Sequence, residues 1–325
     1  MTPKISVIVP IYNAGEYLSR CLTSLSKQTL TDIEIICVLD CPTDGSDKVV
    51  KQYAQFDSRF VVVENEQNIG VAASRNKGIE LAKGEYVGFS DHDDWHEPFM
   101  YEELYAKAQK TNADIVTSNT MVHYQDKEKT YSFADMSKEV MIQSILLPVD
   151  SPLCRNKLAR SVWHSVYKTK FIRDNGITFY NRGDFFEEDT LFNCISYSLT
   201  GSVAHVNKVL YHWNLIRPND AHKYDHSHSL QVFLNYLSVI MCWVKDKKLL
   251  TAIVTEHFYN YWSYYRKTPN SEVRNMMGDN VKYLDFHSLK FIYGDKWWWN
   301  MLLYNRRLML KFIIYISILK CDLFD

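Results

Sequence analysis

No stretch of 18 consecutive apolar residues occurs in the 325-residue chain, so we expect no membrane span. The net charge of −1 provides no global field that would favour nucleic acid. The seven cysteines form no Cys-x-x-Cys pair and no zinc-ligand spacing, which is typical of reduced thiols in a cytosolic protein. No signal-peptide pattern precedes the first strand-like segment, so we expect a cytoplasmic location.

Glycine-rich phosphate loops are also missing from the start of the chain. Residues 5–10 read as a buried strand, but residues 11–15 contain no G-x-G-x-x-G sequence and no basic glycine-rich loop. The first absence disfavours a dehydrogenase, and the second disfavours a nucleotidyltransferase.

The first 120 residues alternate between strand and helix patterns. Apolar runs predict strands at 5–10, 34–39, 60–64, 86–90 and 115–118. Helical spacing fills the gaps between them, with Asn13 as a candidate cap of the first helix. This alternation predicts an α/β fold, a mostly parallel Rossmann-like sheet with helices on both faces. We expect a second part over 121–225 and a helical, aromatic-rich C-terminal region over 226–325.

Three carboxylates follow directly after the apolar strand that ends at Ser90. Asp91, Asp93 and Asp94 stand within four positions, where like charges repel unless a cation lies among them. A hard divalent cation prefers such oxygen ligands, and ligands of open α/β sheets bind where strands end. The cluster therefore predicts a metal-bound phosphate ester; the alternative is a solvated acidic turn that caps the next helix.

Four segments resemble family 2 glycosyltransferases in order and spacing. They are ISVIVPIYN (5–13), VLDCPTDGS (38–46), NIGVAASRNKG (68–78) and GEYVGFSDHDDW (84–95). The match is close over residues 4 to 118 and looser from 160 to 220. The resemblance implies a GT-A fold and transfer of a hexose or N-acetylhexosamine from a nucleotide sugar to a hydroxyl of a glycan.

The resemblance also implies a metal site and a nucleotide site. Asp91-His92-Asp93 is similar to the family's DxD motif, with Asp93 as the direct Mn²⁺ or Mg²⁺ ligand and Asp91 on ribose or metal-bound water. Asp94 is a candidate for either of these roles or for capping the turn that follows. His212 is a further candidate metal ligand. The other residues expected to bind the nucleotide sugar are Pro10, Tyr12, Asn13, Asp40, Arg75, His92 and Arg217.

Asp40 is the residue that bears on the choice of nucleotide. In the family an aspartate at this position accepts from the base, and uracil offers one N–H between two carbonyls. This favours UDP, although guanine also offers donors. The chain departs from the common Gly-Ser that follows this aspartate, because Cys41-Pro42 stands there and proline stiffens the loop.

The motif Glu187-Glu188-Asp189 resembles the family's late acidic motif, in which the aspartate is the catalytic base. An inverting transfer is a single in-line displacement, so one carboxylate must take the proton of the acceptor hydroxyl. We assign this role to Asp189, with Glu188 as second candidate. The alternative is that Asp189 only caps its own helix.

The remaining patterns leave alternatives open. The histidines around residue 225 suit a structural zinc less well than a loop that closes over the substrates. The segment 306–320 is basic and aromatic, and it either packs in the protein or lies on the inner membrane surface, where a lipid-linked glycan acceptor would be found. The alternatives to a transferase are a non-catalytic nucleotide-sugar-binding protein and a nucleotidyltransferase. The sequence assigns neither the sugar nor the oligomeric state.

Overall fold

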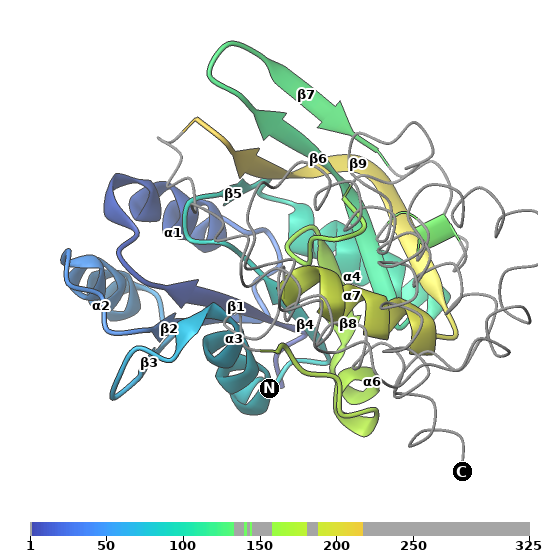
Figure 1. The fold of residues 1–325 in the computed structure, drawn as a ribbon, viewed down its shortest axis with the longest axis horizontal. Coiled ribbons are helices and arrows are strands. Elements are labelled where there is room, and N and C mark those ends of the chain that lie inside the picture. Colours follow the sequence, from blue (N-terminus) through green and yellow to red (C-terminus); the bar gives the residue numbers. More distant parts are fainter. Residues whose placement is uncertain (1, 133–139, 142–143, 145–157, 181–187, 217–325) are drawn as a thin grey trace, which may run out of the picture. The chain divides into compact units, whose positions relative to one another are not determined.

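A computed structural model describes residues 2–132, 140–141, 144, 158–180 and 188–216 (Figure 1). The chain divides into two units, Met1–Tyr224 and Asp225–Asp325, and every described residue belongs to the first. The predictions for Arg217, for the histidines around residue 225 and for the segment 306–320 therefore lie outside the described residues. Among the residues that are described, no helix has the length and apolar character needed to cross a bilayer.

The first part of the sheet is parallel, as the sequence predicts. Its strands are β1 (Ile5–Ile11), β2 (Ile33–Leu39), β3 (Phe60–Glu64) and β4 (Tyr86–Phe89), in the order β3-β2-β1-β4. The connecting helices are α1 (Leu18–Ser26), preceded by the 3₁₀ turn η1 (Gly15–Tyr17), α2 (Ser46–Phe56) and α3 (Gly70–Leu81). Every residue of β1 and β2 is buried, which explains their uninterrupted apolar character.

The second part of the sheet is mixed. β8 (Ser165–Lys168) lies antiparallel between β4 and β6 (Ile115–His123), β9 (Val203–Asn214) runs parallel to β6, and β5 (Trp95–His96) closes the edge. β7 (Glu128–Tyr131) forms a hairpin with β6 that extends from the body (Figure 1). The helices of this part are α4 (Met100–Thr111), α6 (Thr169–Asp174) and α7 (Glu188–Leu199).

Helix α3 lies close against β1, and this places its first turns beside the ends of the parallel strands. A Cβ added at Gly78 would lie 2.4 Å from Ile8 Cγ2, so only glycine permits this approach. On the other side, Phe179 stacks on Phe192 of α7 at 4.1 Å between ring centroids and meets Phe89 of β4 edge to face. These contacts bring the starts of α3 and α7 to the end of β4.

The structure corrects the predicted cap of the first helix. Asn13 has φ 46° and does not cap α1; its Oδ1 accepts from Thr43 N at 2.8 Å. Asp44 instead accepts from Ser46 N at 3.0 Å and from Gly15 N at 2.8 Å. The prediction failed because a long-range partner on the loop after β2 competes for the Asn13 side chain.

Candidate active site

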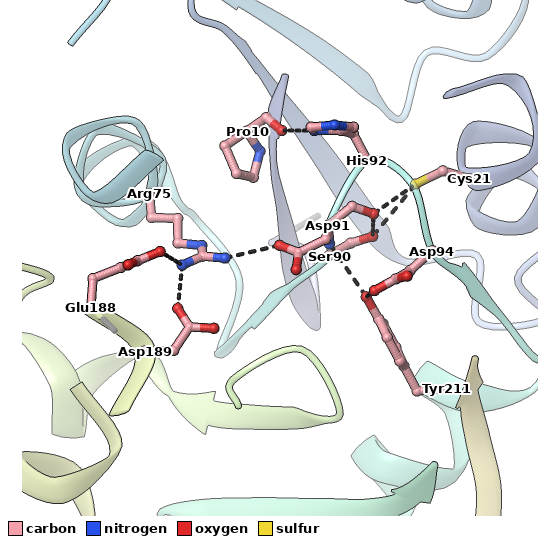
Figure 2. A network of polar contacts seen from close by, with 10 residues as sticks. All are labelled: Pro10, Cys21, Arg75, Ser90, Asp91, His92, Asp94, Glu188, Asp189 and Tyr211. Carbon is pink, nitrogen blue, oxygen red and sulfur yellow. Dashed lines mark hydrogen bonds and ion pairs between the residues drawn. The ribbon is translucent and has the colours of Figure 1, made fainter. Parts of the chain in front are cut away.

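A buried arginine joins the acidic loop to the start of helix α7. Arg75 on α3 has a side chain only 3% exposed, and its Nη2 donates to Asp91 Oδ1 at 2.9 Å. Its Nη1 donates to Glu188 Oε1 at 3.3 Å and also contacts Asp189 Oδ1 (Figure 2). Residues from the loop after β4, from α3 and from α7 are therefore gathered at the carboxyl end of β4.

The charge of the arginine is secured by its neighbours. Burial lowers the pKa of Arg75, but Asp189, Asp91 and Glu188 outweigh it and the net pKa is raised, so the guanidinium stays charged. This one guanidinium faces all three carboxylates.

Asp94 has a structural role that the sequence left open. The Tyr211 hydroxyl donates to Asp94 Oδ2 at 2.6 Å, and Asn214 N donates to Asp94 Oδ1 at 2.8 Å. Burial, followed by the charges of Asp93 and Asp91, raises the pKa of Asp94 well above its usual range. Asp94 therefore fastens the acidic loop to the end of β9.

Asp93 lies in the same loop with 5% of its surface exposed. Its backbone carbonyl accepts from Arg20 Nη2 and from Asn214 Nδ2, both at 3.3 Å. The Arg20 guanidinium lies 3.7 Å from the centroid of the Trp95 ring, which holds it in place. The backbone at Asp93 is thus fixed from two sides.

The two predicted histidines are placed differently from each other. His92 Nδ1 lies 3.2 Å from the Pro10 carbonyl oxygen, so it stays at the end of β1 (Figure 2). His212 has both ring nitrogens in hydrogen bonds, to Glu97 Oε1 and to His123 Nε2, each at 2.9 Å. Because those atoms are engaged, we leave His212 out of the proposed metal ligands.

The residues expected to bind the base lie where β1 and β2 end. Asp40 is 4% exposed and accepts from Asn65 Nδ2, Ile69 N and Gly70 N, each at 2.8 Å. Tyr12 is 48% exposed beside it, as a stacking ring would be. Cys41 has φ 56°, which explains why a glycine suits this position.

Several residues at the site gave no signal in the sequence. Asn65, Asn214 and Arg20 are isolated polar residues, and Tyr211 lies in the loosely matched segment 160–220 without a role assigned to it. All four act through long-range contacts. A single sequence does not show which distant residues these side chains contact.

The acidic loop supplies the ligand type of a hard cation. Within the described residues no three His, Cys, Asp or Glu side chains form a group that could hold a metal by themselves. Mg²⁺ is usually bound by one or two carboxylates, with waters and substrate phosphates completing the shell. Asp91 and Asp93 fit the carboxylate part of such a shell.

The parallel strands β3-β2-β1-β4 with their connecting helices define a Rossmann-like α/β protein, and the acidic cluster follows the last of these strands. The sequence profile of "Glycosyl transferase family 2" matches residues 6–187. The chain therefore belongs to glycosyl transferase family 2.

Two relatives illustrate the similarity in sequence. "Putative glycosyltransferase EpsH" of Bacillus subtilis (strain 168) is 34% identical over 221 residues, which cover 66% of this chain and 61% of that protein. "Glycosyltransferase GlyA" of Streptococcus pneumoniae serotype 4 is 32% identical over 218 residues, 65% of this chain and 30% of that protein. The chain thus spans less than two thirds of the length of either relative.

Solved structures share the fold. The chain matches S. aureus TarS 1-349 in complex with UDP-GlcNAc with a TM-score of 0.69 and 21% identity, over 86% of this chain and 80% of that one. TarS 1-349 in complex with UDP matches with a TM-score of 0.67 and 22% identity, over 86% and 79% of the two chains. The predicted GT-A fold is confirmed.

Proposed function

We propose that this chain transfers a hexose or N-acetylhexosamine from a UDP-sugar to a hydroxyl of a glycan acceptor, with inversion. The observation that carries the proposal is the Arg75 cluster, in which one guanidinium contacts Asp91 of the acidic loop and Asp189 at the start of α7. Donor and acceptor chemistry would then meet at one place. The structural neighbour bound to UDP-GlcNAc supports a UDP-sugar donor.

Asp189 is the proposed base. The Arg75 guanidinium contacts its carboxylate and holds it at the start of α7. Its side chain is 20% exposed, so an acceptor hydroxyl can approach it. Glu188, which is 12% exposed and bound to the same guanidinium, is the second candidate.

Asp93 and Asp91 are the proposed metal ligands. When bound, Mg²⁺ or Mn²⁺ neutralises the charge that grows on the diphosphate as the glycosidic bond breaks. The protein contributes the fixed loop: Asp94 and Asn214 fasten it to β9, while Arg75 fixes Asp91. Tyr12, Pro10, Asn13 and Asp40 would line the nucleotide pocket.

The test is calorimetric titration of UDP and a panel of UDP-sugars with Mn²⁺, then with EDTA, followed by measurement of sugar release. We expect metal-dependent UDP binding and slow hydrolysis of one UDP-sugar. Asp189→Asn should keep UDP binding and lose about 10²- to 10⁴-fold in turnover. Asp174→Asn, an exposed carboxylate on α6 paired with Lys170, is the control.

Four results would contradict the proposal or a part of it. Absence of nucleotide binding with any metal would remove the donor site. Full activity in Asp189→Asn would remove the assigned base, and a loss in Glu188→Gln alone would transfer the role to Glu188. UDP binding without turnover in the native chain would favour a non-catalytic binding protein.

A further inference from the structure

Among the described residues, the carboxylate of Asp40 has one acceptor position left. Oδ1 accepts from Asn65 Nδ2 and from Ile69 N, both at 2.8 Å. Oδ2 accepts from Gly70 N alone, at 2.8 Å. A carboxylate offers about four lone-pair sites, two on each oxygen. Oδ1 is therefore saturated, and Oδ2 keeps one site.

The edges of the nucleobases differ in how many such sites they need. Guanine presents an N1–H and an amino N–H side by side, and a carboxylate pairs with them through one lone pair on each oxygen. Uracil presents a single N3–H. A carboxylate with one saturated oxygen therefore suits uracil and leaves a guanine N–H without an acceptor.

We propose that Asn65 is a specificity-determining residue, which limits Asp40 to bases with one N–H donor by occupying Oδ1. The inference rests on the proposed function, namely on nucleotide binding beside Asp40. Ile69 N and Gly70 N belong to the backbone at the start of α3 and are common to any side chain there. Within the described part of the chain, Asn65 is the one side chain that donates to Asp40 Oδ1.

Asn65 is held firmly in this position. It is 9% exposed, its Nδ2 also donates to Ser74 Oγ at 3.1 Å, and its Oδ1 accepts from Lys77 Nζ at 2.8 Å. Its backbone N donates to Leu39 O at 2.9 Å. Since three hydrogen bonds hold the side-chain amide and one holds the backbone, we expect the side chain to keep this position when a base binds.

The first experiment changes the ligand and leaves the protein intact. UDP, GDP and IDP are titrated into the native chain with Mn²⁺, because the hypoxanthine of IDP has the N1–H of guanine but no amino group. We expect UDP to bind tightest and IDP to bind about tenfold or more tighter than GDP, the cost of one unpaired donor.

Three outcomes of this titration would overturn the proposal. Equal affinities for GDP and IDP would mean that the amino group meets no saturated oxygen. Binding of neither purine would mean that ring size excludes guanine. Binding of no nucleotide at all would overturn the proposed function as well, so the two failures are distinguishable.

The second experiment removes the Asn65 amide. In Asn65→Ala a water can take its place on Oδ1 and be displaced by a ligand, so the preference for UDP over GDP should fall about tenfold. Ser74→Ala is the matched control, because it removes the other acceptor of the same amide nitrogen and leaves Oδ1 occupied. An unchanged preference in Asn65→Ala, or an equal fall in Ser74→Ala, would refute the role of Asn65.

Discussion

The Tyr211 hydroxyl links the acidic loop to strand β9: it donates to Asp94 Oδ2 at 2.6 Å and accepts from Asp91 N at 3.4 Å. Tyr211 is fully buried, and its ring stacks on Trp163 at 4.4 Å between centroids. A rigid ring therefore places one hydroxyl between two aspartates of the loop. This arrangement fixes the Asp94 carboxylate and the Asp91 backbone at one point of the loop.

Tyr211→Phe should destabilise the fold by about 1–3 kcal/mol, because the buried Asp94 carboxyl loses a donor. Metal-dependent UDP binding should weaken too, since the loop loses its tie to β9. Urea denaturation and calorimetry measure the two effects. Tyr101→Phe is the control, because the Tyr101 hydroxyl is buried without a hydrogen-bond partner among the described residues. Equal losses in the two variants would contradict the role of Tyr211.

Arg75→Met should cost about 3–5 kcal/mol, because it leaves three carboxylates without their cation. Arg75→Lys keeps the charge, but a lysine ammonium cannot contact Asp91 and Asp189 at once as the guanidinium does. We therefore expect this variant to lose most of its turnover while its unfolding free energy falls less than in Arg75→Met. Arg173→Lys is the control: Arg173 binds backbone carbonyls at the other end of α3, including Ile79 O at 2.7 Å. Donor binding should survive in that variant; if it does not, general loosening of α3 explains the Arg75 effect.

Stability should fall as the pH is lowered from about 6.5 to about 4. Burial lowers the pKa of His164 to about 4, whereas an unfolded histidine titrates near 6.5. Within this window the unfolded chain binds a proton that the folded chain does not, so lower pH favours unfolding, by up to about 3 kcal/mol. Burial lowers the pKa of His96 to about 3, which acts in the same direction.

Urea denaturation at pH 7, 6 and 5 checks this slope. His164→Gln should show a shallower dependence on pH than the native chain, whatever its stability at pH 7. A slope that is unchanged in the variant would assign the effect to other groups.

Cys41→Gly should keep or raise the unfolding free energy, by up to about 1 kcal/mol, because Cys41 sits at φ 56°. Cys41→Val should lower it by about 1–2 kcal/mol, since a β-branched side chain is disfavoured there. Thermal unfolding of the two variants shows which of them is more stable. A valine variant as stable as the glycine variant would show that the backbone relaxes.

The sequence predicted the four parallel strands β1 to β4 and the start of β6, but it predicted none of β5, β7, β8 and β9. β1 and β2 are continuous apolar runs that fit only a covered parallel sheet. β8 has four residues, SVYK, and lies antiparallel between β4 and β6, far from both in sequence. Four residues carry too little periodicity to define a strand, and their pairing is set by long-range packing.

At the site, the sequence identified the acidic residues of the loop after β4 and of the start of α7, but it did not assign a role to each side chain. Asp91, Asp94 and Asp189 are chemically alike, and the sequence left a cap, a ligand and a base as options. The folded chain separates them: Arg75 pairs with Asp91 and Asp189, while Tyr211 and Asn214 engage Asp94.

What the sequence alone determined is the class of protein: buried parallel strands, ligand-type residues where those strands end, and the family to which they belong. These follow from local periodicity and from residue types at fixed spacing. The tertiary structure decided which polar groups meet, such as Asn65 with Asp40 and Arg75 with Asp189. Hydrogen bonds are directional and short, so their partners are fixed only when distant segments pack together.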